Sequence, residues 1–192
     1  MAVTFDTIKD DFFELRDFIL NDLKIITNAP KGGNYAAALL IATACEALGT
    51  LRCGKKDAGE DFFRDYFMPK EWRPVAKSIY HALRDGLAHS FLTKVILQVA
   101  DKPIELGISW KKEAHFEYDS SRATLFLNVQ QLSEDLHQAF ERYEAELKED
   151  TKRRDNFVKW RKKQQEYHVH NKNETEKAAW KELLEHGNEK RI

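Results

Sequence analysis

One segment of the chain, residues 35–51, is apolar on almost every side of a helix, and this constrains the fold more than any other feature. It reads Tyr-Ala-Ala-Ala-Leu-Leu-Ile-Ala-Thr-Ala-Cys-Glu-Ala-Leu-Gly-Thr-Leu, and Glu46 is its only charged residue. A helix that is apolar all round is buried in the centre of a bundle or in an interface. Asn34 is placed to cap it, and Pro30 with Gly32-Gly33 separates it from the preceding segment.

Four further segments repeat apolar residues at helical intervals, which predicts a bundle. The first covers residues 4–27, and a short helix follows near 60–67. A helix from about 71 to 91 comes next, with Pro74 in its first turn. A long helix begins near 129. The predicted fold class is mainly α (α+β), an antiparallel helical bundle with a small sheet.

The period of the pattern changes between residues 93 and 128. Apolar residues alternate over 95–99 and 104–110, and 115–119 with 124–127 suggest a second hairpin. We therefore expect a small antiparallel meander of three or four strands, inserted in a domain over 1–148. Charged residues dominate after that, which predicts a charged helical extension over 149–192.

Composition excludes several classes of partner. The formal net charge of −1 over 192 residues gives no overall attraction to nucleic acid or membrane. Cys45 and Cys53 lack metal-ligand spacing, and the absence of a disulfide framework favours a reducing compartment. The N-terminal residues do not resemble a signal peptide, and the apolar run 35–45 is shorter than a bilayer span. We expect a cytoplasmic protein with no membrane partner.

The segment most suited to catalysis is Arg84-Asp85-Gly86-Leu87-Ala88-His89, at the end of a predicted helix. Histidine moves protons near neutral pH and arginine binds phosphate, so the pair suffices to cleave RNA without a metal. On a helical wheel with Leu83 at zero, Arg84 falls at about 100° and His89 at about 240°. They would then form two walls of a polar groove floored by Ala88, and a bend at Gly86 would let His89 swing.

The alternative is a solvated helix face on which Arg84 pairs with an acid while His81 and His89 have no function. Glu46 has two compatible interpretations as well. A buried carboxylate is costly unless it is paired, so we expect a salt bridge to Arg84, Arg52 or another base. It would also be placed to orient Arg84 or His89.

The segment 82–91 resembles the motif helix of the HEPN superfamily (higher eukaryotes and prokaryotes nucleotide-binding). That motif is an Arg, four to six residues and a His, often with Asn, Asp or His directly after the Arg; here that residue is Asp85. Residues 34–49 resemble the buried helix that precedes the motif. The resemblance covers roughly 1–91 and 129–148, and the predicted strands and the tail lie outside it.

The resemblance implies a metal-independent endoribonuclease that works as a homodimer and needs no cofactor. His89 would remove the proton of a ribose 2′-hydroxyl and Arg84 would stabilise the charge on the phosphate. The products would be 2′,3′-cyclic phosphate and 5′-hydroxyl ends. Asp85, with Glu46 and His81, would support this pair. Such a protein is expected to act as a toxin or phage-defence effector, with an antitoxin or other regulatory protein as partner.

The strongly basic stretch of the chain lies between residues 152 and 163. If the ribonuclease hypothesis holds, it is an auxiliary RNA contact through basic side chains and one aromatic ring; the residues are Arg153, Arg154, Lys159, Trp160 and Arg161. The favoured alternative is a charged helix that docks Phe157 and Trp160 onto the bundle. His168 and His170 lack a third ligand, so no metal site is predicted.

Two other functions remain open from the residues alone. One is a non-catalytic HEPN-like module that dimerises or binds a nucleotide or protein, with Arg84 and His89 as remnants or ligand contacts. The other is a helical scaffold in which the motif match is accidental.

Overall fold

The computed structural model describes residues 3–29, 33–90, 96–99, 102–110 and 115–167, together with Lys181. The chain divides into two compact units, residues 1–160 and 161–192. The predicted mainly helical class is confirmed. The helices are α1 (Lys9–Thr27), α2 (Asn34–Cys53), α3 (Gly59–Tyr66), α4 (Ala76–Ser90), α5 (Val129–Glu149) and α6 (Thr151–Tyr167), with short 3-10 helices η1 (Phe5–Thr7) and η2 (Lys70–Val75).

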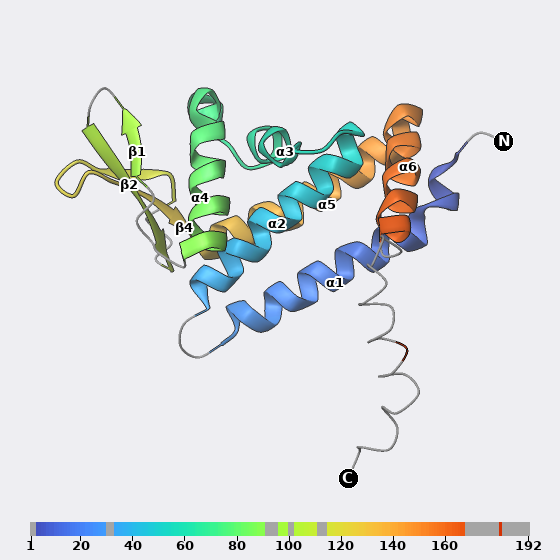
Figure 1. Cartoon of the computed structure of the whole chain (residues 1–192), viewed down its shortest axis with the longest axis horizontal. Coiled ribbons are helices and arrows are strands. Elements are labelled where there is room, and N and C mark those ends of the chain that lie inside the picture. The colour runs from blue at the N-terminus through green and yellow to red at the C-terminus, as the bar shows by residue number, and fades with distance from the viewer. Residues whose placement is uncertain are drawn as a thin grey trace, which may run out of the picture. The chain divides into compact units, whose positions relative to one another are not determined.

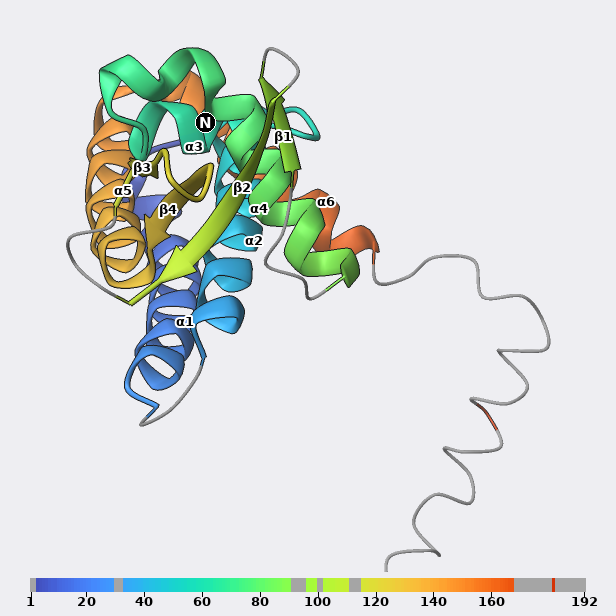
Figure 2. The same ribbon diagram turned by 90° about the vertical axis from the view of Figure 1, so that its left-hand side faces the viewer.

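Helix α2 lies at the centre of the bundle, as its apolar sequence predicts. Helices α1, α3, α4 and α5 all contact it, and Figure 1 shows it beside α1 and α4 and in front of α5. Figure 2 shows the same helices from the side. Its fully buried side chains include Ala38, Ile41, Ala42, Cys45 and Leu48. By length and composition α2 is also the one helix among the described residues that could cross a membrane, and half of that apolar window is buried in the protein. Burial in the core therefore accounts for about half of this apolar window.

The limits of α2 depend on its neighbours. Gly33 precedes the helix, so the predicted cap Asn34 is the first helical residue and its side chain instead donates to the Ile108 carbonyl. Gly54 ends the helix in the left-handed conformation with φ 68°. At Gly49 a Cβ atom would collide with the carbonyl oxygen of Ala58. Glycine at 49 thus lets the start of α3 pack directly on α2.

Helix α4 begins later than the sequence suggests and runs without interruption to Ser90. It starts at Ala76 rather than near 71, because Pro74 lies in the preceding 3-10 helix η2. The helix is not interrupted at Gly86, and α4 continues as an α-helix to Ser90. Helical hydrogen bonding and packing on α2 and α3 outweigh the modest cost of one glycine inside a helix.

A four-stranded sheet stands between α4 and α5 in the chain, where strands were predicted, but it is not the expected antiparallel meander. Its strands are β1 (Ile96–Val99), β2 (Lys102–Ser109), β3 (Glu117–Asp119) and β4 (Thr124–Asn128), in the order β1-β2-β4-β3. Strands β1 and β2 form the predicted hairpin, as do β3 and β4, whereas β2 and β4 are parallel.

Burial explains this order. In β4 Leu125 and Leu127 are buried, whereas β3 reads Glu-Tyr-Asp and is largely exposed. The apolar strand therefore takes the central place and the polar strand the edge. The sheet contacts α4, α2 and α5 (Figure 2).

The start of α6, residues 151–160, belongs to the first unit and packs on the bundle, so the predicted docking of Phe157 and Trp160 is confirmed. Phe157 is fully buried with its ring 6.3 Å from that of Phe12, and Trp160 is 7% exposed. The first compact unit thus extends through Trp160, beyond the position where charged residues begin to dominate the sequence.

A network of charged side chains joins α2, α3, α5 and α6. The Arg52 guanidinium donates to Glu146 on α5 through Nε at 2.9 Å and to Asp65 on α3 through Nη1 at 2.9 Å. Tyr66 donates to Glu146 at 2.6 Å, and Arg153 lies 3.4 Å from the same carboxylate. Since each helix contributes at least one group, this network holds together one end of the bundle.

Candidate functional site

Helix α4 separates its core face from its polar face as the helical wheel predicts. Ile79, Tyr80, Leu83 and Leu87 are each at most 3% exposed. Arg84 and Asp85 are partly exposed, and His81 and Ala88 are exposed. The buried side contacts α2 and α3. The core therefore fixes the helix and leaves its polar side available for chemistry.

Arg84 is held by the acid that follows it. Its Nη1 donates to Asp85 Oδ1 at 3.0 Å, and the two side chains are 42% and 45% exposed. Partial burial lowers the pKa of Arg84, but the hydrogen bond with Asp85 and the charge of Glu46 outweigh this and raise it above its ordinary value. The arginine is thus a permanent cation with an oriented guanidinium, which carries further N–H donors for a phosphate.

Glu46 is near Arg84 but does not form the predicted salt bridge within the described residues. Its carboxylate accepts a hydrogen bond from the Tyr80 hydroxyl at 2.9 Å. Burial, together with the charge of Glu46, raises the pKa of Tyr80, so the hydroxyl keeps its proton. A neutral phenol from α4 therefore satisfies the carboxylate, and the negative charge of Glu46 stays available to attract Arg84. Arg52, the other expected partner, binds Glu146 and Asp65 instead.

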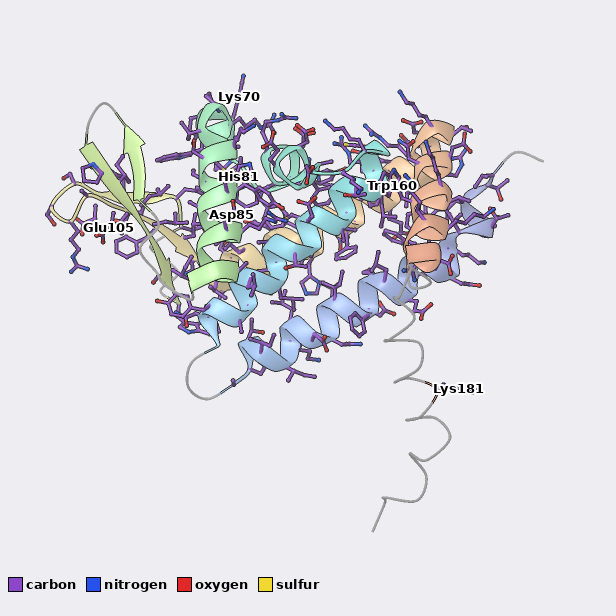
Figure 3. The ribbon with its side chains drawn as sticks, in the orientation of Figure 1. Lys70, His81, Asp85, Glu105, Trp160 and Lys181 are labelled. Atoms are coloured by element: carbon purple, nitrogen blue, oxygen red, sulfur yellow. The ribbon has the colours of Figure 1, made fainter. Side chains whose placement is uncertain are left out.

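His81 is not idle, as the alternative interpretation of α4 supposes. Its Nδ1 lies 3.3 Å from Asp85 Oδ2 and its Nε2 lies 3.1 Å from Glu60 Oε2. Figure 3 labels His81 and Asp85 along α4. Asp85 therefore contacts both Arg84 and His81 through different oxygens. Glu60, on α3, was not predicted from the sequence, and no spacing signals it because the contact spans 21 positions.

The side chain of His89 lies outside the described residues. Its backbone belongs to α4, so Arg84 and His89 are on one continuous helix. His168 and His170 also lie outside the described residues. Within the described part of the chain, no group of three or more His, Cys, Asp or Glu side chains is placed to hold a metal ion.

An apolar groove of about 540 Å³ lies between α4 and the first half of α2. The side of α2 that lines this groove is open to solvent. Leu87 contributes the α4 side, and Ala36 and Thr43 of α2 are exposed within it. The remaining lining residues are Gly33, Tyr35, Leu39 and Leu40. This groove has few polar atoms in its wall, so it suits an apolar protein surface better than a phosphate.

The basic residues predicted as an auxiliary RNA contact differ in how far they are exposed and in what they bind. Arg153 donates to the Arg52 carbonyl oxygen at 2.9 Å, and Arg154 donates to the carbonyl oxygens of Val3, Leu147 and Lys148. The Trp160 ring is buried and offers no open face for base stacking. Lys159 is exposed, and Arg161 belongs to the second compact unit. The two arginines therefore tie helix ends together in this structure.

No family model, no curated protein and no solved structure matches the chain.

Proposed function

We propose that this protein is a metal-independent endoribonuclease of the HEPN type, with Arg84 and His89 as its catalytic pair. One observation carries the proposal: α4 holds Arg84 on its partly exposed side in an oriented contact with Asp85, while its apolar side is fixed in the core. Arg84 thus lies on the partly exposed side of a firmly packed helix whose backbone continues through His89. A preorganised cation at such a position stabilises developing negative charge without reorganisation.

In this mechanism His89 accepts the proton of a ribose 2′-hydroxyl, and the oxygen attacks the adjacent phosphorus. The bond from phosphorus to the 5′-oxygen breaks, which leaves a 2′,3′-cyclic phosphate on one fragment and a 5′-hydroxyl on the other. A positioned general base contributes about 10²–10⁴-fold. Arg84 stabilises the negative charge on the phosphoryl oxygens. Asp85 positions Arg84 and does not exchange protons with the substrate.

We propose that the protein acts as a homodimer through the apolar groove beside α4. Exposed apolar patches on soluble proteins mark interaction sites, and Leu87 places this groove one helical turn from Arg84. A second copy packed there would bring two motif helices together and close the polar side of α4. A regulatory protein such as an antitoxin would act by covering the same polar side.

The experiment is incubation of the purified protein with total RNA in the presence of EDTA. We expect cleavage by the wild type and fragments whose 5′ ends accept phosphate from polynucleotide kinase without prior phosphatase treatment. Arg84→Ala and His89→Ala should each lose cleavage by at least about 100-fold. Matched controls are Arg122→Ala on the β3–β4 turn and His137→Ala on α5, both at exposed positions of the described chain.

The controls should retain wild-type cleavage, and all four variants should keep the wild-type circular dichroism spectrum. Full activity in Arg84→Ala or His89→Ala would refute the assignment of the catalytic pair. Absence of cleavage by the wild-type dimer would refute the ribonuclease function itself.

A second function is favoured by the contacts of Arg84. Its guanidinium already has an acidic partner, as expected of a structural or ligand-binding arginine. In that case the protein is a non-catalytic module of the same type that dimerises through the same groove. Dimer formation in ultracentrifugation without any RNA cleavage would support this function over the first.

A further inference from the structure

Four side chains of α3 and α4 form one continuous series of polar contacts that ends at Arg84. Glu60 Oε2 lies 3.1 Å from His81 Nε2, and His81 Nδ1 lies 3.3 Å from Asp85 Oδ2. Asp85 Oδ1 then accepts from Arg84 Nη1 at 3.0 Å. The series connects the first turn of α3 to the candidate catalytic arginine on α4.

Both ring nitrogens of His81 face carboxylate oxygens, and this restricts the protonation state that satisfies them. An ionised carboxylate only accepts hydrogen bonds, whereas a neutral imidazole has one N–H and one lone pair. The doubly protonated ring donates to Glu60 and Asp85 together. In the neutral ring one lone pair would face an oxygen, so one of the two contacts must open.

The other charges around the ring decide what happens when the contact opens. On α4 Lys77 lies 3.4 Å from Glu60, so Glu60 keeps a cation without His81. Asp85 keeps Arg84 in the same way. The Tyr80 ring packs edge-on against the imidazole at 5.8 Å between centroids, and Glu46 on α2 lies behind it. When His81 is neutral and its contact with Asp85 opens, the ring no longer fixes the Asp85 carboxylate. The carboxylate can then rotate, and the Arg84 guanidinium that it binds is no longer held in one orientation.

We propose that Glu60 and His81 are positioning residues for Arg84, and that Asp85 holds the guanidinium in a fixed orientation only while His81 is doubly protonated. The consequence for catalysis rests on the proposed ribonuclease function. Under that function, RNA cleavage falls on the alkaline side as His81 loses its proton and Arg84 loses its fixed orientation.

The test reads Arg84 directly and does not depend on catalysis. The ¹⁵N–¹H signal of the Arg84 Nε–H group, assigned by its loss in Arg84→Lys, is followed against pH in the full-length protein. We expect a transition in the wild type that is lost in His81→Gln, because the neutral amide binds Asp85 at every pH. In Glu60→Gln the transition should move to lower pH. Lys77→Gln, which removes a neighbour of Glu60 but no ring contact, should keep a transition.

A wild-type Arg84 signal without a transition, or the same transition in His81→Gln, overturns the proposal. The pH profile of RNA cleavage is measured on the same proteins, and its alkaline decline should disappear in His81→Gln. If the Arg84 signal behaves as expected and no protein cleaves RNA, the positioning role stands and the ribonuclease function fails. If the alkaline decline persists in His81→Gln, the link between this contact and catalysis is refuted.

Discussion

Replacing Arg52 by methionine removes the cation that joins three helices of the bundle. The Arg52 side chain is only 13% exposed, and it binds Glu146 and Asp65, whose side chains are 33% and 30% exposed. Methionine has a similar length and keeps much of the packing. The substitution therefore tests the charge network rather than the size of the side chain.

The expected loss of stability follows from the burial of the partners. Removing one member of a buried ion pair costs about 3–5 kcal/mol, because the remaining charge is left without compensation. Here the compensation is only partly lost. Both carboxylates keep about a third of their exposure, Glu146 keeps Arg153 and Tyr66, and Asp65 keeps Arg64, so we expect no more than about 3 kcal/mol, the lower end of that range. For a chain of this size, this corresponds to a fall in Tm of about 6–12 °C.

The assay is urea unfolding at pH 7, followed by circular dichroism at 222 nm. The midpoint should fall while the slope of free energy against urea is unchanged, since the surface exposed on unfolding stays the same. Arg122→Met is the matched control, because that arginine is 71% exposed and its pair with Asp119 is on the surface. It should cost less than about 1 kcal/mol. Equal losses in the two variants would refute the argument.

The same network predicts how stability changes in acid. Burial raises the pKa of Glu146, but hydrogen bonds from Arg52 and Tyr66 outweigh it and hold the pKa below its ordinary value of 4.5. A carboxyl group with a lowered pKa stabilises the fold above its unfolded pKa, and this contribution is lost as the pH falls through the folded pKa. The stability difference between wild type and Arg52→Met should therefore shrink below about pH 4.5. A difference that stays constant down to pH 2 would contradict this.

Three further substitutions or modifications test the packing. Gly49→Ala should destabilise by about 3 kcal/mol, because the new methyl group meets the Ala58 backbone, and an unchanged Tm would contradict this close approach. Phe157→Ala should cost about 3–5 kcal/mol in urea unfolding, and a loss near zero would show that α6 does not dock in solution. A thiol reagent should label Cys53 in the native protein and leave Cys45 unmodified, since burial and the charge of Glu46 raise the pKa of Cys45; equal labelling rates would count against its burial.

Local patterns in the sequence are enough to predict the helices and the face that each helix buries. Ile79, Leu83 and Leu87 recur at helical spacing, and all three are in the core. The apolar composition of α2 likewise predicts its central place. These features follow from the sequence because burial of apolar area and helical periodicity are properties of neighbouring residues.

Local sequence patterns do not predict contacts between segments that are far apart in the chain. The sequence predicts a basic partner for Glu46, yet the Tyr80 hydroxyl, 34 positions away, donates to its carboxylate. Glu60 meets His81 only because α3 packs against α4. The predicted meander fails for the same reason, since the place of β4 beside β2 depends on which strand buries more apolar area.

The sequence by itself determined the helical class, the buried helix α2 and the presence of Arg84, Asp85 and His89 on one helix. Only the tertiary structure decided the order of the strands, the partner of Glu46 and the contact between His81 and Glu60. The physical reason is that periodicity and propensity act over one or two helical turns. The partner of a buried polar group depends on which segments the whole core brings together.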